Sequence, residues 1–121
     1  MKFFPKRVDK PWGYESWWAH NDKYVGKLIH VDANKRLSWQ YHTKKDETMF
    51  CLSGNAVLVH EQDGKVIEET LKPGESFRIS PGTKHRLKAG AGGCDVLEAS
   101  TPEVDDVVRL EDDYGREAPL A

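Results

Sequence analysis

The 121-residue chain lacks any long apolar run, and its unbroken apolar stretches are only a few residues long. A helix needs about 20 consecutive, mostly apolar residues to cross a bilayer, so no membrane-spanning helix is expected. The N-terminal Met-Lys-Phe-Phe is followed at once by Pro5, Lys6 and Arg7, which leaves no secretory hydrophobic region. These absences predict a soluble protein of the cytoplasm.

An excess of one charge is also lacking, because 18 basic and 20 acidic residues give a formal net charge of −2 and are mixed along the chain. Nucleic-acid and membrane-surface proteins carry basic stripes or patches, so neither kind of partner is expected. Cysteine is scarce, and Cys51 and Cys94 form no CxxC pair. In a reducing compartment we expect two buried free thiols rather than a disulfide.

No internal repeat and no Gly/Pro/Ser-rich linker divides the sequence. A chain of this length has room for one domain. We therefore expect a single domain over residues 1–121, with an N-terminal arm over 1–20, a barrel over about 21–110 and a C-terminal tail over 111–121.

Short runs that alternate apolar and polar residues, separated by turn residues, predict an all-β protein. The expected strands cover residues 25–31, 48–53, 56–61, 65–71, 96–100 and 104–110. Asp63-Gly64 predicts a hairpin turn, Gly54-Asn55 a strand break and 89–93 a flexible loop, while Asp112 onward is expected to form a turn or short helix. Many short strands in so short a chain favour a closed barrel or jelly roll, because closure removes exposed sheet edges.

Polar residues that could bind a metal occur at strand spacing near the middle of the chain. Gln40 and His42 are two residues apart, so on a strand their side chains leave the same face. Glu47 can rejoin that face only if the chain turns across residues 43–46, and the polar Thr-Lys-Lys-Asp sequence there suits a turn.

Glu47 heads an apolar row, because Met49 and Cys51 follow it at alternate positions. A carboxylate in such a row is costly to bury unless it is paired or bound to a cation. His85 has Leu87 two residues further on, which predicts that it also faces inward.

Together Gln40, His42, Glu47 and His85 predict a site for one divalent transition metal. Two imidazoles, a carboxylate and an amide oxygen suit Zn best, with Mn, Fe, Ni or Co as alternatives, and suit Ca or Mg less well. The other histidines, His20, His30 and His60, have no such neighbours and are interpreted as structural residues.

Two segments resemble the motifs of the cupin superfamily. Gln40-x-His42-x4-Glu47-x6-Gly54 is similar to the first motif, His-x-His-x(3–4)-Glu-x6-Gly, with Gln in place of the first His. Gly74-x7-Gly82-x2-His85 is similar to the second. The resemblance implies a single cupin β-barrel, a double-stranded β-helix or jelly roll.

A closer resemblance is to the C-terminal isomerase domain of bacterial mannose-6-phosphate isomerase/mannose-1-phosphate guanylyltransferase proteins. The segments that carry it are Pro11-Trp12-Gly13, Leu37-Ser38-Trp39-Gln40-Tyr41-His42, Asp105-Asp106-Val107-Val108-Arg109 and Asp113-Tyr114-Gly115-Arg116. They run in the family's order over nearly the whole chain. Phosphomannose isomerases are known for a Gln-His-Glu-His ligand set, so the resemblance implies a metal-dependent sugar isomerase.

One departure lies beside the expected metal. The family usually has a further His and an Arg-x-Glu-His-Trp sequence around the position of Glu47, where this chain has Lys44, Lys45, Thr48 and Met49. A pocket altered at this point leaves open a different substrate or a loss of activity.

Four further side chains are candidates for the reaction. Lys27 lies on the mostly apolar face of its strand, so it either lines a cavity, where it could meet a phosphate, or extends to the barrel rim. Arg109 and Glu98 match family positions and are the candidate catalytic residues, with structural ion pairs as the alternative. Lys44 is a candidate for substrate binding at the rim.

Arg86 and Lys88 alternate with His85 and Leu87, and they are expected to face solvent. Trp12, Trp17 and Trp18 lie in the N-terminal arm, where packing in a core or an interface is favoured over sugar stacking.

Two functions are consistent with the sequence. The first is a metal-dependent aldose–ketose isomerase acting on a phosphosugar, with a sugar or sugar phosphate as its partner. The second is a non-catalytic or differently catalytic cupin, such as a sugar-binding module or an Fe-dependent oxygenase. A homodimer is expected, because a small barrel with a Trp-rich arm buries little surface on its own.

Overall fold

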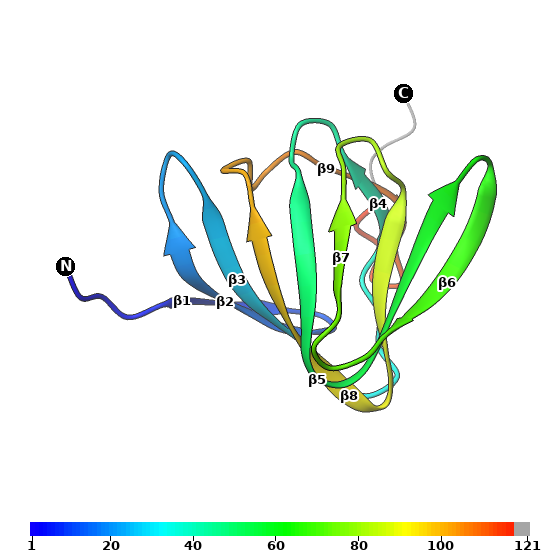
Figure 1. The fold of residues 1–121 in the computed structure, drawn as a ribbon, viewed down its shortest axis with the longest axis horizontal. Coiled ribbons are helices and arrows are strands. Elements are labelled where there is room, and N and C mark those ends of the chain that lie inside the picture. Colours follow the sequence, from blue (N-terminus) through cyan, green and yellow to red (C-terminus); the bar gives the residue numbers. More distant parts are fainter. Residues whose placement is uncertain (118–121) are drawn as a thin grey trace.

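The computed structural model describes residues 1–117, which form nine β-strands and no helix (Figure 1). The strands are β1 (Lys6–Lys10), β2 (Gly13–His20), β3 (Val25–Val31), β4 (Trp39–His42), β5 (Glu47–Gln62), β6 (Lys65–Leu71), β7 (Ser76–Ile79), β8 (His85–Ser100) and β9 (Val107–Glu111). The all-β class predicted from the sequence is therefore confirmed. No segment of this part of the chain forms a helix long and apolar enough to cross a membrane.

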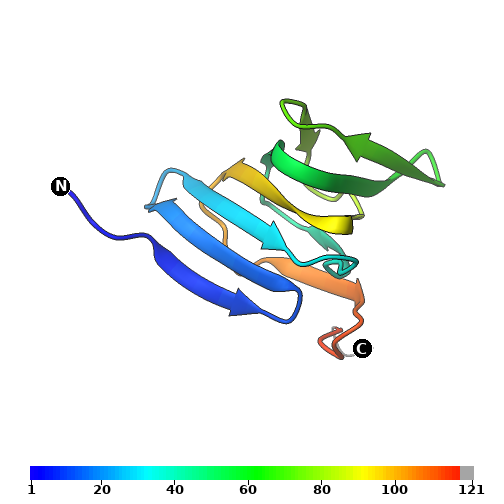
Figure 2. The same cartoon turned by 90° about the horizontal axis from the view of Figure 1, so that it is seen from below.

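All nine strands belong to one antiparallel sheet that curls on itself. Its main path runs β1-β2-β3-β8-β4-β9, and β5 pairs with β6, β7 and β8. Figure 2 shows β1, β2, β3 and β8 lying next to one another, with the β5–β6 hairpin at the opposite end of the curl. The sheet thus forms an open barrel whose concave side holds the core.

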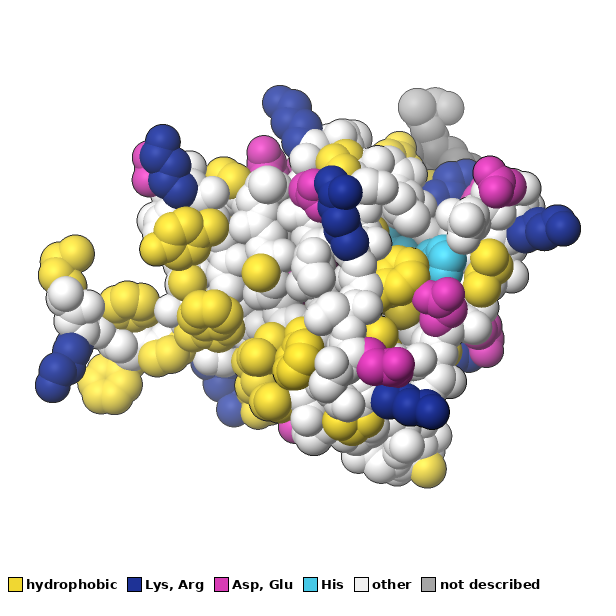
Figure 3. Space-filling view, viewed as in Figure 1, with side chains coloured by type: hydrophobic (Ala, Val, Ile, Leu, Met, Phe, Trp, Pro, Cys, Tyr) yellow, Lys and Arg dark blue, Asp and Glu magenta, His cyan; other side chains and the backbone are white. Residues whose placement is uncertain are grey.

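The first 20 residues, expected to form an arm, mostly join the sheet. β1 pairs with β2, β2 pairs with β3, and Trp12 in the turn between β1 and β2 is only 2% exposed. Residues 1–5 project from the body, and Phe3 and Phe4 are exposed (Figure 1). Figure 3 shows hydrophobic side chains along this projecting segment and over the neighbouring part of the molecule.

Two strands continue through positions where the sequence predicted interruptions. β5 passes through Gly54-Asn55 and β8 passes through residues 89–93, with irregular register between Gly54 and Ala56. The backbones approach so closely there that a Cβ on Gly54 would lie 2.4 Å from the Gly93 carbonyl oxygen. These glycines therefore permit a close crossing rather than ending the strands.

Elsewhere the turns agree with the prediction more closely. Asp63 and Gly64 both have positive φ angles, 52° and 75°, at the β5–β6 hairpin. After β9 the chain forms a turn in which the Gly115 amide donates to the Asp112 carbonyl. Residues 118–121 of the expected tail lie outside the described part of the chain.

The expectation that Arg86 faces solvent is wrong. Its side chain is 6% exposed, and its Nε donates to the Leu37 carbonyl at 2.9 Å. Its Nη2 also donates to the Glu111 carbonyl at 3.5 Å, so contacts with neighbouring segments bury Arg86 although alternation along its strand predicts exposure. Lys88, on the same face, is half-buried and pairs with Glu68 at 2.7 Å.

The concave side of the sheet carries both the apolar core and a group of polar side chains. The core includes Ile29, Met49, Leu58, Leu87 and Val96, and both cysteines are buried and free. Cross-strand pairing places Trp17, Lys27, Glu98 and Met49 in one inward-facing row from β2 to β5. This row brings charged groups to the edge of the core.

Replacing Gly54 with alanine tests the close crossing of β5 and β8. Gly54 and Gly64 both have positive φ, but a Cβ on Gly64 meets nothing within 4 Å. Gly64→Ala should cost about 1–2 kcal/mol for the left-handed backbone. Gly54→Ala should cost about 1–3 kcal/mol more, because its Cβ clashes with the facing backbone. Urea unfolding of both variants measures the difference, and equal losses of stability would contradict the crossing.

Candidate metal centre and its cavity

The candidate metal ligands come from the ends of three strands. Gln40 and His42 lie on β4, Glu47 begins β5 and His85 begins β8, with Gln40 and His85 opposite each other in register. One nitrogen of each histidine and one oxygen of Glu47 lie within 4.8 Å of one another. The structure thus brings together three of the four residues through atoms that could bind one ion, and Gln40 lies beside them.

The turn at residues 43–46 places Glu47 on the inward face. Asp106 holds this turn, because its Oδ2 accepts hydrogen bonds from the backbone amides of Lys44 and Lys45 at 2.8 and 3.0 Å. Burial acts to raise the pKa of Asp106, but these two amides lower it below its ordinary value. Asp106 is therefore a carboxylate that fixes the chain between two of the candidate ligands.

Hydrogen bonds set the orientation of both histidines. The Nδ1 of His85 lies 2.8 Å from the Thr83 carbonyl, which can only accept, so Nδ1 carries the proton and Nε2 presents its lone pair. The Nδ1 of His42 faces Asp106 at 3.3 Å, while its Nε2 faces Glu47. Burial lowers the pKa of His42 to about 4, so this ring is neutral near pH 7.

Both imidazole rings approach the same carboxylate oxygen of Glu47. Its Oε1 lies 3.1 Å from the Nε2 of His85 and 3.7 Å from the Nε2 of His42, and the side chain is 2% exposed. Burial acts to raise the pKa of Glu47, but the neighbouring side chains of His85 and Glu98 and the charge of Lys45 hold it well below its ordinary range. A buried carboxylate facing two nitrogen lone pairs requires a cation, and these donors fit a divalent transition metal.

Lys45 joins the candidate metal centre to Glu98, and the sequence analysis missed this role. Its Nζ lies 2.9 Å from Glu47 Oε2 and 3.2 Å from Glu98 Oε2, and the side chain is 5% exposed. Although burial lowers it, the pKa of Lys45 is raised because Glu98 and Glu47 surround the ammonium. Lys45 lies in the turn before β5, where strand alternation does not apply, so the sequence carries no direct signal of this role.

Glu98 is, like Glu47, a deeply buried carboxyl group beside the candidate metal centre, with 3% of its surface exposed. Burial, followed by the negative charge of Glu47, raises the pKa of Glu98 to about 8, against the opposing effect of Lys45. A carboxyl group whose pKa lies near neutrality can both accept and return a proton under ordinary conditions.

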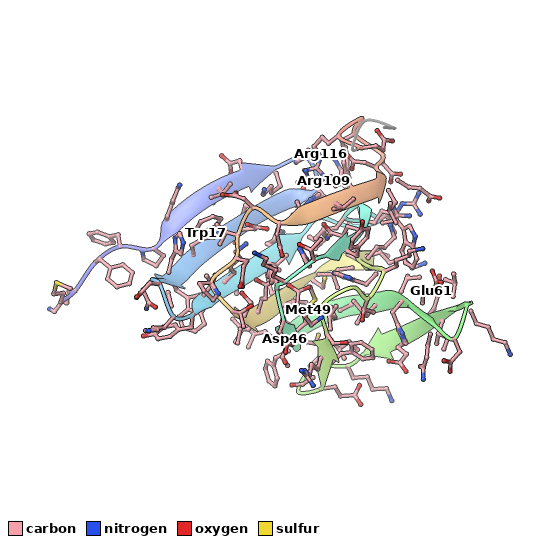
Figure 4. The ribbon with its side chains drawn as sticks, turned by 90° about the horizontal axis from the view of Figure 1, so that it is seen from above. Trp17, Asp46, Met49, Glu61, Arg109 and Arg116 are labelled. Carbon is pink, nitrogen blue, oxygen red and sulfur yellow. The ribbon has the colours of Figure 1, made fainter. Side chains whose placement is uncertain are left out.

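A cavity of about 480 Å³ opens beside the candidate ligands. Gln40, His42 and Glu47 line it, together with Lys27, Glu98 and Arg109, so the structure brings three of the four further candidates to the same space. Lys44 is exposed and is not among the lining residues. Figure 4 shows Arg109 near the upper edge of the view, next to Arg116 and away from Met49 and Trp17.

Lys27 is held inside the cavity by a neighbouring carboxylate. Its Nζ lies 3.4 Å from Glu15 Oε1 and 4.6 Å from the centre of the Trp17 ring, and Trp17 donates to the same Glu15 oxygen at 2.8 Å. Lys27 therefore faces the cavity, but its charge is largely balanced by Glu15.

The other histidines lie apart from this group. His30 pairs with Asp95 at 2.7 Å, and His60 packs against Phe77 with ring centroids 4.8 Å apart. His20 is exposed and contacts the edge of Trp17.

Comparison of the sequence with known families gives one match that covers most of the chain. Residues 3–112 match the family described as mannose-6-phosphate isomerase C-terminal. The chain is 36% identical over 116 residues to the mannose-1-phosphate guanylyltransferase of Escherichia coli K12, covering 92% of this chain and 23% of that protein. It is 30% identical over 115 residues to the xanthan biosynthesis protein XanB of Xanthomonas campestris, covering 92% and 24%. The chain thus spans about a quarter of the length of these relatives.

Solved structures of distant sequence share the fold. The capsular polysaccharide assembling protein CapF from Staphylococcus aureus matches with a TM-score of 0.79 at 16% identity, over 91% of this chain and 32% of that one. KdgF from Halomonas sp. matches with a TM-score of 0.71 at 20% identity, over 84% and 91%. Oxalate decarboxylase from Bacillus subtilis matches with a TM-score of 0.77 at 13% identity, over 88% and 30%.

Removing one imidazole tests the candidate metal centre. His85→Ala should reduce bound metal from about one ion per chain to a trace, because the remaining donors leave the coordination incomplete. Elemental analysis after dialysis measures the metal, and circular dichroism checks that the sheet persists. His20→Ala is the control, since His20 lies outside the group. Equal metal content in the two variants would place the ion elsewhere.

Proposed function

Because the chain belongs to the mannose-6-phosphate isomerase C-terminal family, we propose that it is a metal-dependent aldose–ketose isomerase acting on a phosphosugar such as mannose 6-phosphate. Its fold is the all-β cupin barrel that the sequence predicted, as the structural likenesses show. The relatives' transferase names describe proteins about four times longer, so they assign no reaction to this chain.

One observation carries the proposal: three of the four candidate metal ligands and a buried acid/base carboxyl group open on the same cavity. His42 and Glu47 line that cavity with Glu98, and Lys45 lies between the two carboxylates. An aldose–ketose isomerisation needs such a pair of functions, a polarised carbonyl oxygen and a group that moves a proton between neighbouring carbons.

Gln40, His42, Glu47 and His85 would hold the metal, which would supply Lewis-acid polarisation of the sugar's carbonyl and hydroxyl oxygens. Zn suits this mixed nitrogen and oxygen donor set best. In the proposed reaction the carboxylate of Glu98 takes the proton from the carbon beside the carbonyl and returns it to the former carbonyl carbon, while the hydroxyl proton of the first carbon passes to the former carbonyl oxygen. Lys45 stabilises the charged form of Glu98 before the first transfer and after the second.

The remaining lining residues bind and orient the sugar. Arg109 offers a planar set of donors, and Lys27, held by Glu15, presents its ammonium toward the cavity. Lys44 lies outside the lining residues, so the proposal gives it no part in substrate binding.

A non-catalytic sugar-binding or metal-binding cupin is the second candidate, and the ion pairs of Lys27 and Lys45 favour it. Both lysines are engaged by carboxylates of the chain itself, as expected if the charges inside the barrel are structural. The isomerase reading is favoured by Arg109, which lines the cavity without an ion-pair partner in the described part of the chain.

A turnover assay separates these candidates. The metal-replete protein should interconvert mannose 6-phosphate and fructose 6-phosphate, and Glu98→Gln should lower kcat by about 10²–10⁴-fold because the amide cannot carry the proton. Metal content of Glu98→Gln should stay unchanged. Glu68→Gln, outside the cavity, is the matched control. Absence of turnover with every aldose or ketose phosphate tested would favour the binding module.

We also propose a homodimer and a cytoplasmic location. The projecting Phe3 and Phe4 and the half-exposed Trp18 leave apolar surface uncovered, which a second copy could bury. The two free, buried cysteines fit a reducing compartment.

Removing the projecting segment tests the dimer. Sedimentation of the protein should give a dimer at micromolar concentration, and deletion of residues 1–5 should shift it toward the monomer because the exposed phenylalanines are lost. A monomer before deletion, or a dimer that is indifferent to it, would refute the proposed interface.

A further inference from the structure

A second cavity, of about 270 Å³, opens on the outer face of the sheet. Trp39 and Arg86 line it, whereas the neighbours that adjoin them in the chain, Gln40 and His85, belong to the candidate metal centre. Successive side chains of a strand leave opposite faces. The second cavity and the candidate metal centre therefore share β4 and β8 but lie on opposite sides of these strands.

Arg86 brings a buried guanidinium to this second cavity. Its side chain is 6% exposed, and its Nε and Nη2 donate to the main-chain carbonyls of Leu37 and Glu111. Within the described part of the chain, no carboxylate forms an ion pair with it and its Nη1 has no hydrogen-bond partner. Burial lowers the pKa of Arg86, and the nearby charge of Arg36 lowers it further. A buried donor group of this kind favours a ligand that brings an oxygen acceptor.

Most other charges of the lining are balanced within the chain. The lining residues Arg36, Lys88, Glu61 and Glu68 are all engaged in ion pairs, which are Arg36–Asp113 at 2.8 Å, Lys88–Glu68 at 2.7 Å and Lys84–Glu61 at 3.8 Å. Glu111 is exposed, and its carboxylate has no ion pair among residues 1–117. One donor, Arg86, and one acceptor, Glu111, are thus left for a ligand. This pairing favours a neutral ligand that both accepts and donates hydrogen bonds over an ion of either sign.

Trp39 supplies an aromatic surface beside these polar groups. Its side chain is half-buried, and in the part of the chain that the structure describes no aromatic or cationic side chain stacks on its ring. Val59 and Val66 are the other apolar residues of the lining. The second cavity therefore combines an uncovered indole ring with hydrogen-bonding groups of both kinds, as small-molecule sites commonly do.

We propose that this second cavity binds a neutral sugar ring. A pyranose has an apolar C–H face that packs against the indole of Trp39, and hydroxyl groups that both donate and accept. The Nη1 of Arg86 donates to one hydroxyl oxygen, and the carboxylate of Glu111 accepts from another hydroxyl. The volume lies just below the usual range of ligand pockets, about 300–1,000 Å³, so it suits a single ring rather than a longer saccharide.

This second site is independent of the proposed reaction. No side chain of residues 1–117 lines both cavities. Figure 4 shows Glu61, which lines the second cavity, well away from Trp17 and Arg109 of the first. A sugar held there lies behind the candidate metal centre and is bound without being converted. The proposal therefore does not depend on whether the chain isomerises a phosphosugar.

Nuclear magnetic resonance of the ¹⁵N-labelled, zinc-loaded protein tests the second site. The probes are the methyl α-pyranosides of mannose, glucose and galactose, whose rings cannot open to a carbonyl and so cannot be isomerised. Trp39 lines the second cavity, whereas Trp12 and Trp17 line the first, so their indole N–H signals report on the two spaces separately. At least one glycoside should shift the Trp39 indole and Arg86 Nε–H signals in a saturable manner, while the Trp12 and Trp17 signals change little.

Matched variants on β4 test the role of the indole ring. Trp39→Ala should raise the Kd of that glycoside by about 10-fold or more, because the apolar contact with the ring is lost. Tyr41→Ala is the control, since Tyr41 lies on the same face of β4 but lines neither cavity, and it should change the Kd by less than about 2-fold. Equal losses in the two variants would contradict the contact with Trp39.

The wild-type titrations decide the proposal even if a variant fails to fold. Saturable shifts confined to Trp12 and Trp17 would place the sugar in the first cavity and overturn the second site. Absence of saturable shifts with all the glycosides would also overturn it. Sodium acetate at matched ionic strength should leave the Trp39 and Arg86 signals in place, and a response to acetate in place of the glycosides would make this an anion site instead.

Discussion

The interior of this barrel depends on keeping the Glu47 carboxylate charged while it is almost fully buried. A carboxylate removed from water is unfavourable unless cations or hydrogen-bond donors compensate it. Here Lys45 contacts one oxygen, and two imidazole nitrogens approach the other. Because Thr83 and Asp106 orient those imidazoles, their other nitrogens face Glu47 as candidate ligands of one metal ion. The burial of Glu98 and the negative charge of Glu47 beside it therefore raise the pKa of Glu98, which sets its ability to exchange a proton.

The curled sheet explains why residues far apart in sequence meet at this point. β5 and β8 are long continuous strands that cross closely at Gly54 and Gly93, and this crossing lets the first half of β8 form a second wall with β4 and β9. The second wall carries Gln40, His42 and Arg109, and the first carries Lys27 and Glu98. The cavity lies between charged groups of both walls. This arrangement suits a polar ligand whose two ends differ chemically.

Sequence periodicity predicted the structural features that depend on one strand alone or on the spacing of a known motif. The alternation of Gln40 with His42 and the turn before Glu47 predicted that these three share a face, and the inward-facing His85–Leu87 pair and the second cupin motif added His85. Lys45 was missed because two consecutive lysines in a polar turn resemble a solvated segment, and its burial depends on Glu98, 53 residues away. Arg86 was predicted wrongly because the carbonyl groups that accept from its guanidinium, those of Leu37 and Glu111, lie far from it in sequence. Trp39 and Arg86 could not be grouped in advance, since only the three-dimensional fold brings them to one cavity on the outer face.

The central claim is that one divalent ion sits among Gln40, His42, Glu47 and His85. The most direct test is anomalous diffraction from crystals of the zinc-loaded protein, measured on both sides of the zinc absorption edge. The account predicts a single strong peak about 2.0–2.3 Å from a donor atom of each of the four side chains. A peak elsewhere on the chain, or an ordered site in which His42 and His85 do not share the ion, would contradict it.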